Sequence, residues 1–121
     1  MAVGISSVFA ISSSDNITAG QTMTITNPGR TMKVVSVRVK GAGNATVKVQ
    51  KGDSGAAGVT FAEGAVADNA LSGWTELDVT GAQNTLTSAN QIRVLVTGGT
   101  INAILLECVG SPQQTLTSAI A

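Results

Sequence analysis

The chain has no histidine and no tyrosine, and it contains a single tryptophan, two phenylalanines and a single cysteine in 121 residues. Without histidine, serine–histidine triads, cysteine–histidine dyads and histidine-based zinc sites are excluded. No other catalytic or cofactor-binding motif takes their place in the sequence. We therefore predict that the protein is not an enzyme and that it needs neither a metal nor a cofactor.

Charge is also scarce, because only seven basic and seven acidic side chains are present and the formal net charge is zero. A neutral, charge-poor surface favours association with other protein surfaces. The longest apolar runs, such as residues 103–106, have four residues, far fewer than the roughly 20 residues that cross a bilayer. We expect no membrane segment, and the N-terminal stretch, which has no basic residue before Arg30, does not resemble a signal peptide.

The lone cysteine, Cys108, cannot form a disulfide within the chain. It lies in the segment Ile-Leu-Leu-Glu-Cys-Val, residues 104–109, which is typical of the interior of a strand. We predict a buried and unreactive thiol.

Short runs rich in β-branched residues alternate with Gly, Asn, Asp and Pro, and no run of ten or more residues has the apolar spacing of a helix. We predict an all-β protein, with residues 1–121 forming one domain. Its expected architecture is a β-sandwich or jelly roll of about eight short antiparallel strands. The predicted strands are residues 5–11, 22–26, 32–40, 45–50, 58–62, 74–79, 92–97 and 100–109.

The remaining segments are predicted to lie outside the strands. Residues 62–73 and 81–91 have the composition of loops, and the last eleven residues begin with Ser-Pro-Gln-Gln and are interpreted as a tail. Residues 1–14 and 111–121 are expected to serve as interaction arms.

Two hairpins are predicted from the spacing of strands and turns. The first joins residues 32–40 to residues 45–50 through Gly-Ala-Gly-Asn, and both strands alternate apolar and polar side chains. The second joins residues 92–97 to residues 100–109 through Gly98 and Gly99, which suit a two-residue loop.

Two departures from simple alternation modify this prediction. Met32 and Val34 are out of phase with Val35, so a β-bulge or a strand twist near Val34 is expected to keep all three side chains inward. Residues 94–96 and 104–106 are apolar on both faces of their strands. This pattern predicts burial from both sides, by a central position in the fold or by another subunit.

Charge is distributed in blocks along the chain. Residues 30–51 carry six of the seven basic side chains and no acid, whereas residues 53–78 carry five of the seven acids and no base. One interpretation is a solvated strand face followed by a polar loop. Another is a basic and an acidic patch that meet between identical subunits. Nucleic-acid binding is not predicted, because the basic segment has no aromatic side chain to stack on bases and the chain is not basic overall.

Trp74, Glu76 and Asp78 fall on one face of a predicted strand, where alternate residues lie about 6.6 Å apart. An aromatic ring beside a carboxylate pair is compatible with sugar binding and, at this separation, with cleavage of a glycosidic bond. Sugar sites usually present several rings in a cleft, and this chain has three in all. We therefore interpret Trp74 as a hydrophobic anchor of the core or of an interface.

Three features together resemble the small β-sandwich decoration, or cement, proteins of tailed-bacteriophage capsids. They are the doubly apolar segment RVLVTGGTINAILLECVG (residues 93–110), the Thr-rich and charge-poor composition, and the length of 121 residues. The resemblance implies a homo-oligomer, usually a trimer, that sits between capsomers of the major capsid protein and reinforces the shell. It implies synthesis in the host cytoplasm and a final location on the capsid surface of the virion.

Under this interpretation, oligomerisation and shell binding require no catalytic residues. The interface consists of a hydrophobic anchor with charged neighbours of both signs. These predicted interface residues are Trp74, Arg38, Lys40, Lys48, Glu76 and Asp78. The alternative from another class is a carbohydrate- or receptor-binding β-sandwich module of a viral fibre or cell surface. That alternative would be favoured if Trp74 were solvent-exposed in the isolated oligomer and its fluorescence shifted with glycans.

Overall fold

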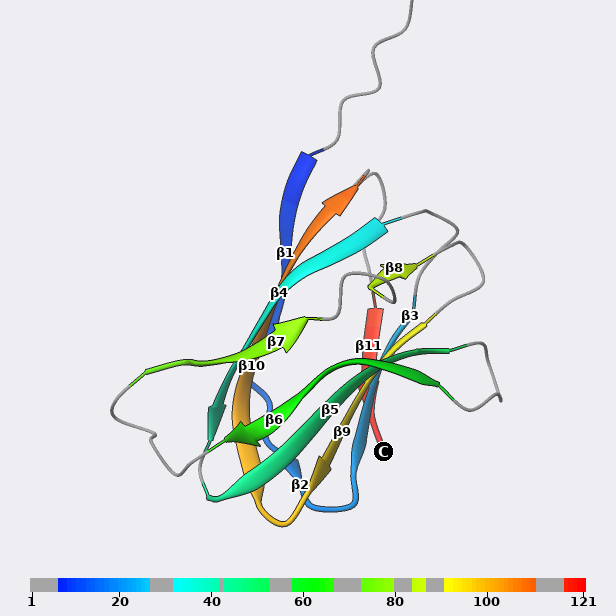
Figure 1. Ribbon diagram of the computed structural model, residues 1–121. Coiled ribbons are helices and arrows are strands. Elements are labelled where there is room, and N and C mark those ends of the chain that lie inside the picture. The colour runs from blue at the N-terminus through cyan, green and yellow to red at the C-terminus, as the bar shows by residue number, and fades with distance from the viewer. Residues whose placement is uncertain are drawn as a thin grey trace, which may run out of the picture.

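The computed structural model describes residues 7–26, 32–41, 43–52, 58–66, 73–79, 84–86, 91–110 and 117–121. These residues form an all-β protein, and no helix occurs among them. The strands build one strongly curled antiparallel sheet (Figure 1). Its strands are β1 (Ser7–Ser13), β2 (Ile17–Thr18), β3 (Thr22–Thr26), β4 (Met32–Gly41), β5 (Ala45–Gly52), β6 (Val59–Val66), β7 (Thr75–Val79), β8 (Thr85–Leu86), β9 (Gln91–Thr97), β10 (Thr100–Gly110) and β11 (Thr117–Ile120).

The hydrogen-bonded path through the sheet runs β1-β10-β4-β7-β6-β5-β9-β3-β11. The two shortest strands lie off this path, with β2 paired to β10 and β8 paired to β4. Strand β7 joins the two halves of the sheet, because it pairs with β4 on one side and with β6 on the other. The all-β prediction is confirmed, whereas a division into two separate sheets, as in a sandwich, is not confirmed by this continuous path.

The pairing of the longer strands connects the two halves of the chain in reverse order. Strand β1 pairs with β10, β3 with β9, β4 with β7, and β5 with β6. These four pairs have the connectivity of one long two-stranded ribbon whose turn lies between β5 and β6. This ribbon is folded over. Further pairings of β10 with β4 and of β9 with β5 join the outer part of the ribbon to its inner part.

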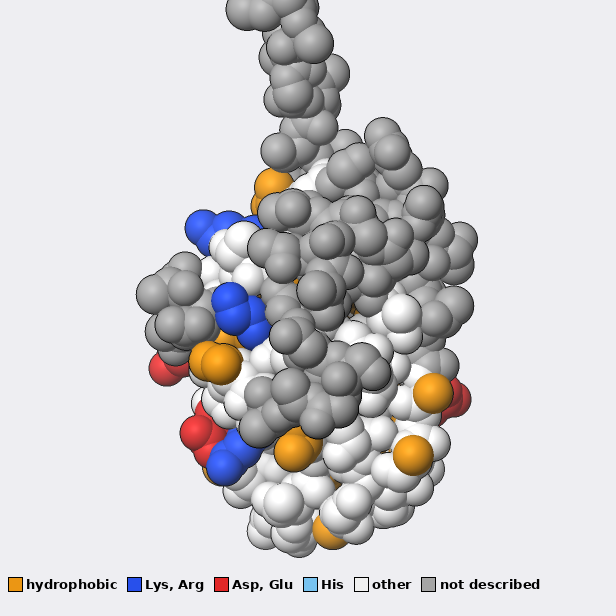
Figure 2. Space-filling view, turned by 90° about the vertical axis from the view of Figure 1, so that its right-hand side faces the viewer, with side chains coloured by type: hydrophobic (Ala, Val, Ile, Leu, Met, Phe, Trp, Pro, Cys, Tyr) orange, Lys and Arg blue, Asp and Glu red, His pale blue; other side chains and the backbone are white. Residues whose placement is uncertain are grey.

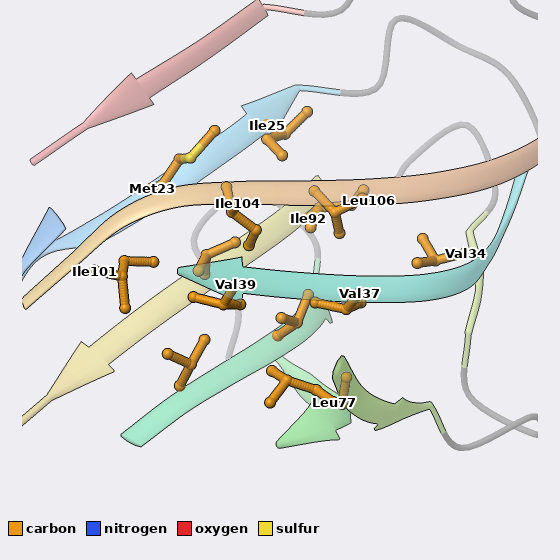
Figure 3. Packing of buried hydrophobic residues seen from close by; sticks show 14 of the residues in the cluster. Met23, Ile25, Val34, Val37, Val39, Leu77, Ile92, Ile101, Ile104 and Leu106 are labelled. Carbon is orange, nitrogen blue, oxygen red and sulfur yellow. The ribbon is translucent and has the colours of Figure 1, made fainter. Parts of the chain in front are cut away.

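The core lies between the two halves of the curled sheet. Met23 and Ile25 of β3 approach it from one side, and Ile104 and Leu106 of β10 from the other (Figure 3). These side chains and their neighbours are fully or almost fully buried, and they belong to a single hydrophobic cluster. Burial of each such aliphatic side chain stabilises the fold by about 1.5–3 kcal/mol relative to exposure.

Each of the eight predicted strands is present, with boundaries that differ by a few residues. The main differences are that β6 continues to Val66 and that β9 begins at Gln91, so parts of two predicted loops belong to strands. Strands β2, β8 and β11 were not predicted. The tail interpretation is wrong for residues 117–120, because β11 pairs with β3 along its length. Residues 1–6 and 111–116 of the expected arms lie outside the described residues.

A buried asparagine fixes the short strand β8 to β4. The side chain of Asn84 is 3 % exposed, and its Nδ2 donates a hydrogen bond of 2.6 Å to the carbonyl oxygen of Val34. The backbone N–H of Val34 in turn donates to the carbonyl oxygen of Asn84 at 3.0 Å. This polar pair holds Leu86, also fully buried, over the end of the core.

Both predicted hairpins are wrong. Strand β4 pairs with β10, β7 and β8, and β5 pairs with β6 and β9, so the connection at residues 41–44 crosses from one half of the sheet to the other. The Gly98-Gly99 connection between β9 and β10 also crosses the core. The alternation in these strands identified a buried and an exposed face, but it is the same for two strands that pair and for two strands that face each other across a core.

The two crossings meet at one end of the molecule, and this contact explains the glycine pair. Gly98 has a φ of +78°, which suits glycine. A Cβ at Gly99 would lie 2.1 Å from the carbonyl oxygen of Asn44. The absence of a side chain at Gly99 therefore allows the two connections to pack backbone against backbone.

The bulge expected near Val34 is present, but its consequence for Val35 was predicted wrongly. Glu107 lies opposite Ser36 and Cys108 lies opposite Val34, so Val35 is the extra residue in β4. Met32 and Val34 are buried, whereas Val35 is 43 % exposed. With Val35 turned outward, the side chains of Met32 and Val34 before the bulge and of Val37 after it all point into the core.

Candidate interaction surface

The six predicted interface residues lie on the outer surface of the sheet, on β4, β5 and β7 and on the residue before β7. Along β7, Glu76 and Asp78 are exposed whereas Leu77 between them is buried. This alternation follows from the two-residue period of a strand, which places the core on one face and solvent on the other. Trp74, one residue before β7, continues the exposed series.

Trp74 is 43 % exposed and belongs to the surface. The interpretation of Trp74 as a core anchor is therefore wrong, and its role as an interface anchor stays a prediction. The ammonium nitrogen of Lys40 lies 4.8 Å from the centroid of the indole ring. This cation–π contact is typically worth about 0.5–1 kcal/mol at an exposed site, and it holds the ring against β4.

Arg38 lies beside two acidic side chains of the same chain. It is opposite Glu76 in the register of β4 and β7, and its Nη1 lies 3.5 Å from Oε1 of Glu107 on β10. The hydroxyl of Ser36 donates a hydrogen bond of 3.4 Å to Oε1 of Glu76. Arg38 therefore has an acidic neighbour on each flanking strand.

Lys48 also has an acidic partner within the chain. Its ammonium nitrogen lies 3.6 Å from Oε2 of Glu63, the residue opposite it on β6. Glu63 in turn lies opposite Asp78 of β7. Lys48 thus partly balances two carboxylates that would otherwise face each other across β6 and β7.

The basic and acidic blocks of the sequence are therefore interleaved by the strand order. Among the described residues, the basic strands β4 and β5 are flanked by acids on β10, β7 and β6. Separate basic and acidic patches do not form on this part of the surface, and the ion pairs lie at exposed positions worth about 0–1 kcal/mol each. Arg30, Asp53 and Asp68 lie outside the described residues.

The outer surface of the sheet also carries apolar side chains. Val35, Val59 and Trp74 are exposed by 43 %, 47 % and 43 %. The strand segments around Leu105 and Leu95 were predicted to be buried from both sides, but these two leucines are only half-buried. On the face seen in Figure 2, charged side chains are few and hydrophobic side chains lie singly among polar ones. Hydrophobic side chains scattered singly in this way are common on protein surfaces.

A shallow depression of about 340 Å³ lies near the crossing connections. It has no acid, base or aromatic ring in its lining, which consists of Asn44, Ala45, Thr46, Ala65, Val66, Thr97 and Gly98. Trp74, Glu76 and Asp78 are not part of it.

The structure confirms that Cys108 is buried. Burial raises the pKa of its thiol from 9.0 to about 12, because the thiolate would be poorly solvated. In the parts of the chain that the structure describes, no group of three or more histidine, cysteine, aspartate or glutamate side chains is placed to hold a metal ion. No helix of these parts has the length and hydropathy needed to cross a bilayer.

The contacts of Trp74 with Lys40 and of Arg38 with Glu107 were not predicted from the sequence. Both depend on the pairing partners of β4, which alternation alone does not determine. Comparison of the chain with protein families, with curated proteins and with solved structures finds no match.

Proposed function

We propose that the protein is a structural protein that associates with itself and decorates a viral capsid, bridging capsomers and stabilising the shell. The observation that carries this proposal is the order of strand pairing. The partners are further copies of the chain and the major capsid protein, and the location is the outer surface of the virion, after synthesis in the host cytoplasm.

The four pairs that join the chain halves in reverse order are those expected of a jelly roll. In that arrangement a long two-stranded ribbon folds over so that its strands form two facing halves, which is a common architecture of viral capsid and lectin domains. The path β1-β10-β4-β7 would be one half and β6-β5-β9-β3 the other. Fold alone does not determine function, and the surface supplies the second part of the argument.

The surface supports association more than chemistry. Exposed Trp74 is the kind of residue that anchors protein interfaces, and its ring is already held in place by Lys40. Val35 adds an exposed apolar side chain on β4. Repetition of a modest contact on a symmetric lattice multiplies its strength, so each copy needs only a small interface.

The proposal is tested by measuring the mass of the purified protein by light scattering over a dilution series, with and without tailed-phage shells that lack it. We expect an oligomer, for which the resemblance implies a trimer, that saturates the shells and raises their resistance to heat. A monomer at all concentrations that does not bind shells would contradict the proposal.

Variants locate the contact. Trp74→Ala and Val35→Ala should weaken self-association or shell binding, whereas Val59→Ala, with a similar exposed fraction on the other half of the sheet, serves as the matched control. Lys48→Glu places like charges opposite each other and tests the charged part of the surface. If Trp74→Ala and Lys48→Glu both leave oligomer mass and shell binding unchanged, the assigned interface is wrong.

The exposure of Trp74 also favours a second candidate, a carbohydrate- or receptor-binding module of a viral fibre or cell surface. One side of the ring is covered by Lys40, and Glu76 and Asp78 follow it along the strand. Because Trp74 is the single tryptophan, its fluorescence reports on this position alone. A saturable fluorescence shift with a glycan, together with loss of binding to the same glycan in Trp74→Ala measured by calorimetry, would support this candidate, and no shift with any glycan would contradict it.

A further inference from the structure

Strand β1 is an edge strand without the features that usually prevent an edge strand from pairing with another chain. Strand β1 forms one end of the hydrogen-bonded path, and among the described residues it pairs with β10 alone (Figure 1). Within the described part of the chain, one of its two edges therefore has backbone N–H and C=O groups that face no neighbouring strand. Such an edge is a template for pairing with another chain.

Natural edges are usually blocked by lysines, prolines, bulges or short length. Strand β1 has none of these features. Its sequence Ser-Val-Phe-Ala-Ile-Ser-Ser has no charge and no proline, and its seven residues pair with β10 in continuous register from Ser7 to Ser13. By contrast β11, at the other end of the path, has four residues.

We propose that β1 is a self-association edge, at which the same strand of a second copy adds in antiparallel orientation. The occupant is a second copy because the strand is compatible with itself. An antiparallel pair centred on Ala10 places Ser7 opposite Ser13 and Phe9 opposite Ile11, and no like charges meet. The zero net charge of the chain adds no long-range repulsion between copies.

This contact is isologous, since each copy offers the same strand to the other, and such two-fold contacts are the commonest in soluble oligomers. It joins two curled sheets into one sheet without using the outer surface around Trp74. The inference goes beyond the proposed function, because a two-fold contact closes at two copies and does not itself build the trimer that the resemblance implies. It requires self-association but no particular shell.

The register centred on Ala10 gives a sharp test, because residue 10 of each copy would face residue 10 of the other. Ala10 is exposed in the single chain and lies opposite Glu107 of β10. Within the chain, Ala10→Lys therefore gains an acidic neighbour, whereas Ala10→Glu gains a like charge, and the stability of each variant is measured before its association. Ala10→Lys and Ala10→Glu each place like charges directly opposite each other and should raise the dissociation constant of the pair by up to about five-fold. An equimolar mixture of the two variants should restore association, because unlike charges then meet.

The matched control is Ala119→Lys, which adds the same charge at an exposed position on β11. This variant should leave the oligomeric state, measured by light scattering, unchanged. Circular dichroism of every variant establishes that the β-structure is retained. Amide hydrogen exchange of the β1 segment, measured at low and high protein concentration, should show protection that appears only as the dimer forms.

The outcomes separate the edge contact from the proposed function. A dimer that Ala10→Lys and Ala10→Glu weaken singly and restore together supports the edge contact. A trimer whose β1 amides gain no protection on association overturns it while leaving the proposed function standing. A monomer that does not bind shells overturns both.

Discussion

Two neighbouring leucines of β10 meet opposite surroundings. Leu106 is fully buried between the two halves of the sheet, whereas Leu105 lies half-buried on the outer surface. The sequence pattern is equally apolar at both positions, so hydrophobicity alone did not distinguish them. The difference teaches that, at positions of equal hydrophobicity, it is the inner positions that stabilise the fold most.

The largest expected effect is the difference in unfolding free energy between alanine variants of these two leucines. Leu106→Ala removes a fully buried side chain and should lower the free energy of unfolding by about 2–5 kcal/mol. Leu105→Ala should lower it by less than Leu106→Ala does, because Leu105 is only partly buried and its loss leaves no closed cavity. Urea unfolding at a concentration where the protein is monomeric measures both. Equal losses would show that the outer surface is covered within a single chain.

A second comparison sets a buried polar contact against exposed ones. Asn84→Ala removes the hydrogen bond to the carbonyl oxygen of Val34 and should cost about 1–3 kcal/mol of stability, because that oxygen is left with one donor fewer. Asn84→Asp preserves the volume but has no N–H donor, so it should be at least as damaging at neutral pH. The same urea titration measures these losses. Wild-type stability in Asn84→Ala would contradict the role assigned to this contact.

The buried thiol of Cys108 makes the free energy of unfolding depend on pH, which an exposed thiol would not do. The pKa of Cys108 is raised from 9.0 in an unfolded chain to about 12 in the folded one. Its contribution to stability is therefore fully present below pH 9 and is lost as the pH rises towards 12. Cys108→Val, which has no titrating group, should lose less stability over that range.

The same burial predicts slow alkylation. In the native protein at pH 8.5, iodoacetamide should modify Cys108 far more slowly than in urea, because the native thiol is both covered and protonated. Mass spectrometry of the labelled protein measures the two rates. Equal rates would mean that β10 opens readily to solvent.

The smallest effect is expected for the exposed ion pair of Lys48 and Glu63. Lys48→Ala should change the free energy of unfolding by less than about 1 kcal/mol, and the change should shrink further in high salt. Lys48→Glu should be somewhat worse, because three acids would then neighbour one another on β5, β6 and β7. A loss comparable to that of Leu106→Ala would contradict the division between inner and outer positions.

Strand positions were predictable because alternation and turn residues are local signals. The pairing of strands was not, since the same alternation serves neighbours in a sheet and partners across a core. This ambiguity produced both hairpin errors, at residues 41–44 and at Gly98-Gly99. The glycine pair was recognised as a turn, but its close approach to Asn44 depends on a segment more than fifty residues away in the sequence.

The predicted interface residues illustrate the same limit. The exposure of Glu76 and Asp78 followed from the phase of the strand around Leu77. The partners of Arg38 and Lys48 did not, because Glu107 and Glu63 become neighbours only through the strand order. The short strands β2, β8 and β11 were missed because two to four residues carry too little periodicity to be distinguished from loops.

The reverse-order pairing of the chain halves has a consequence for the way in which the protein folds as it is made. Strands β5 and β6 are close in sequence and can pair early, whereas Ser7 must wait for Gly110 to leave the ribosome. Long-range pairs of this kind form slowly, because a large loop must close before the contact stabilises it. We expect β1 to remain unpaired for most of synthesis and to be the last strand to join the sheet.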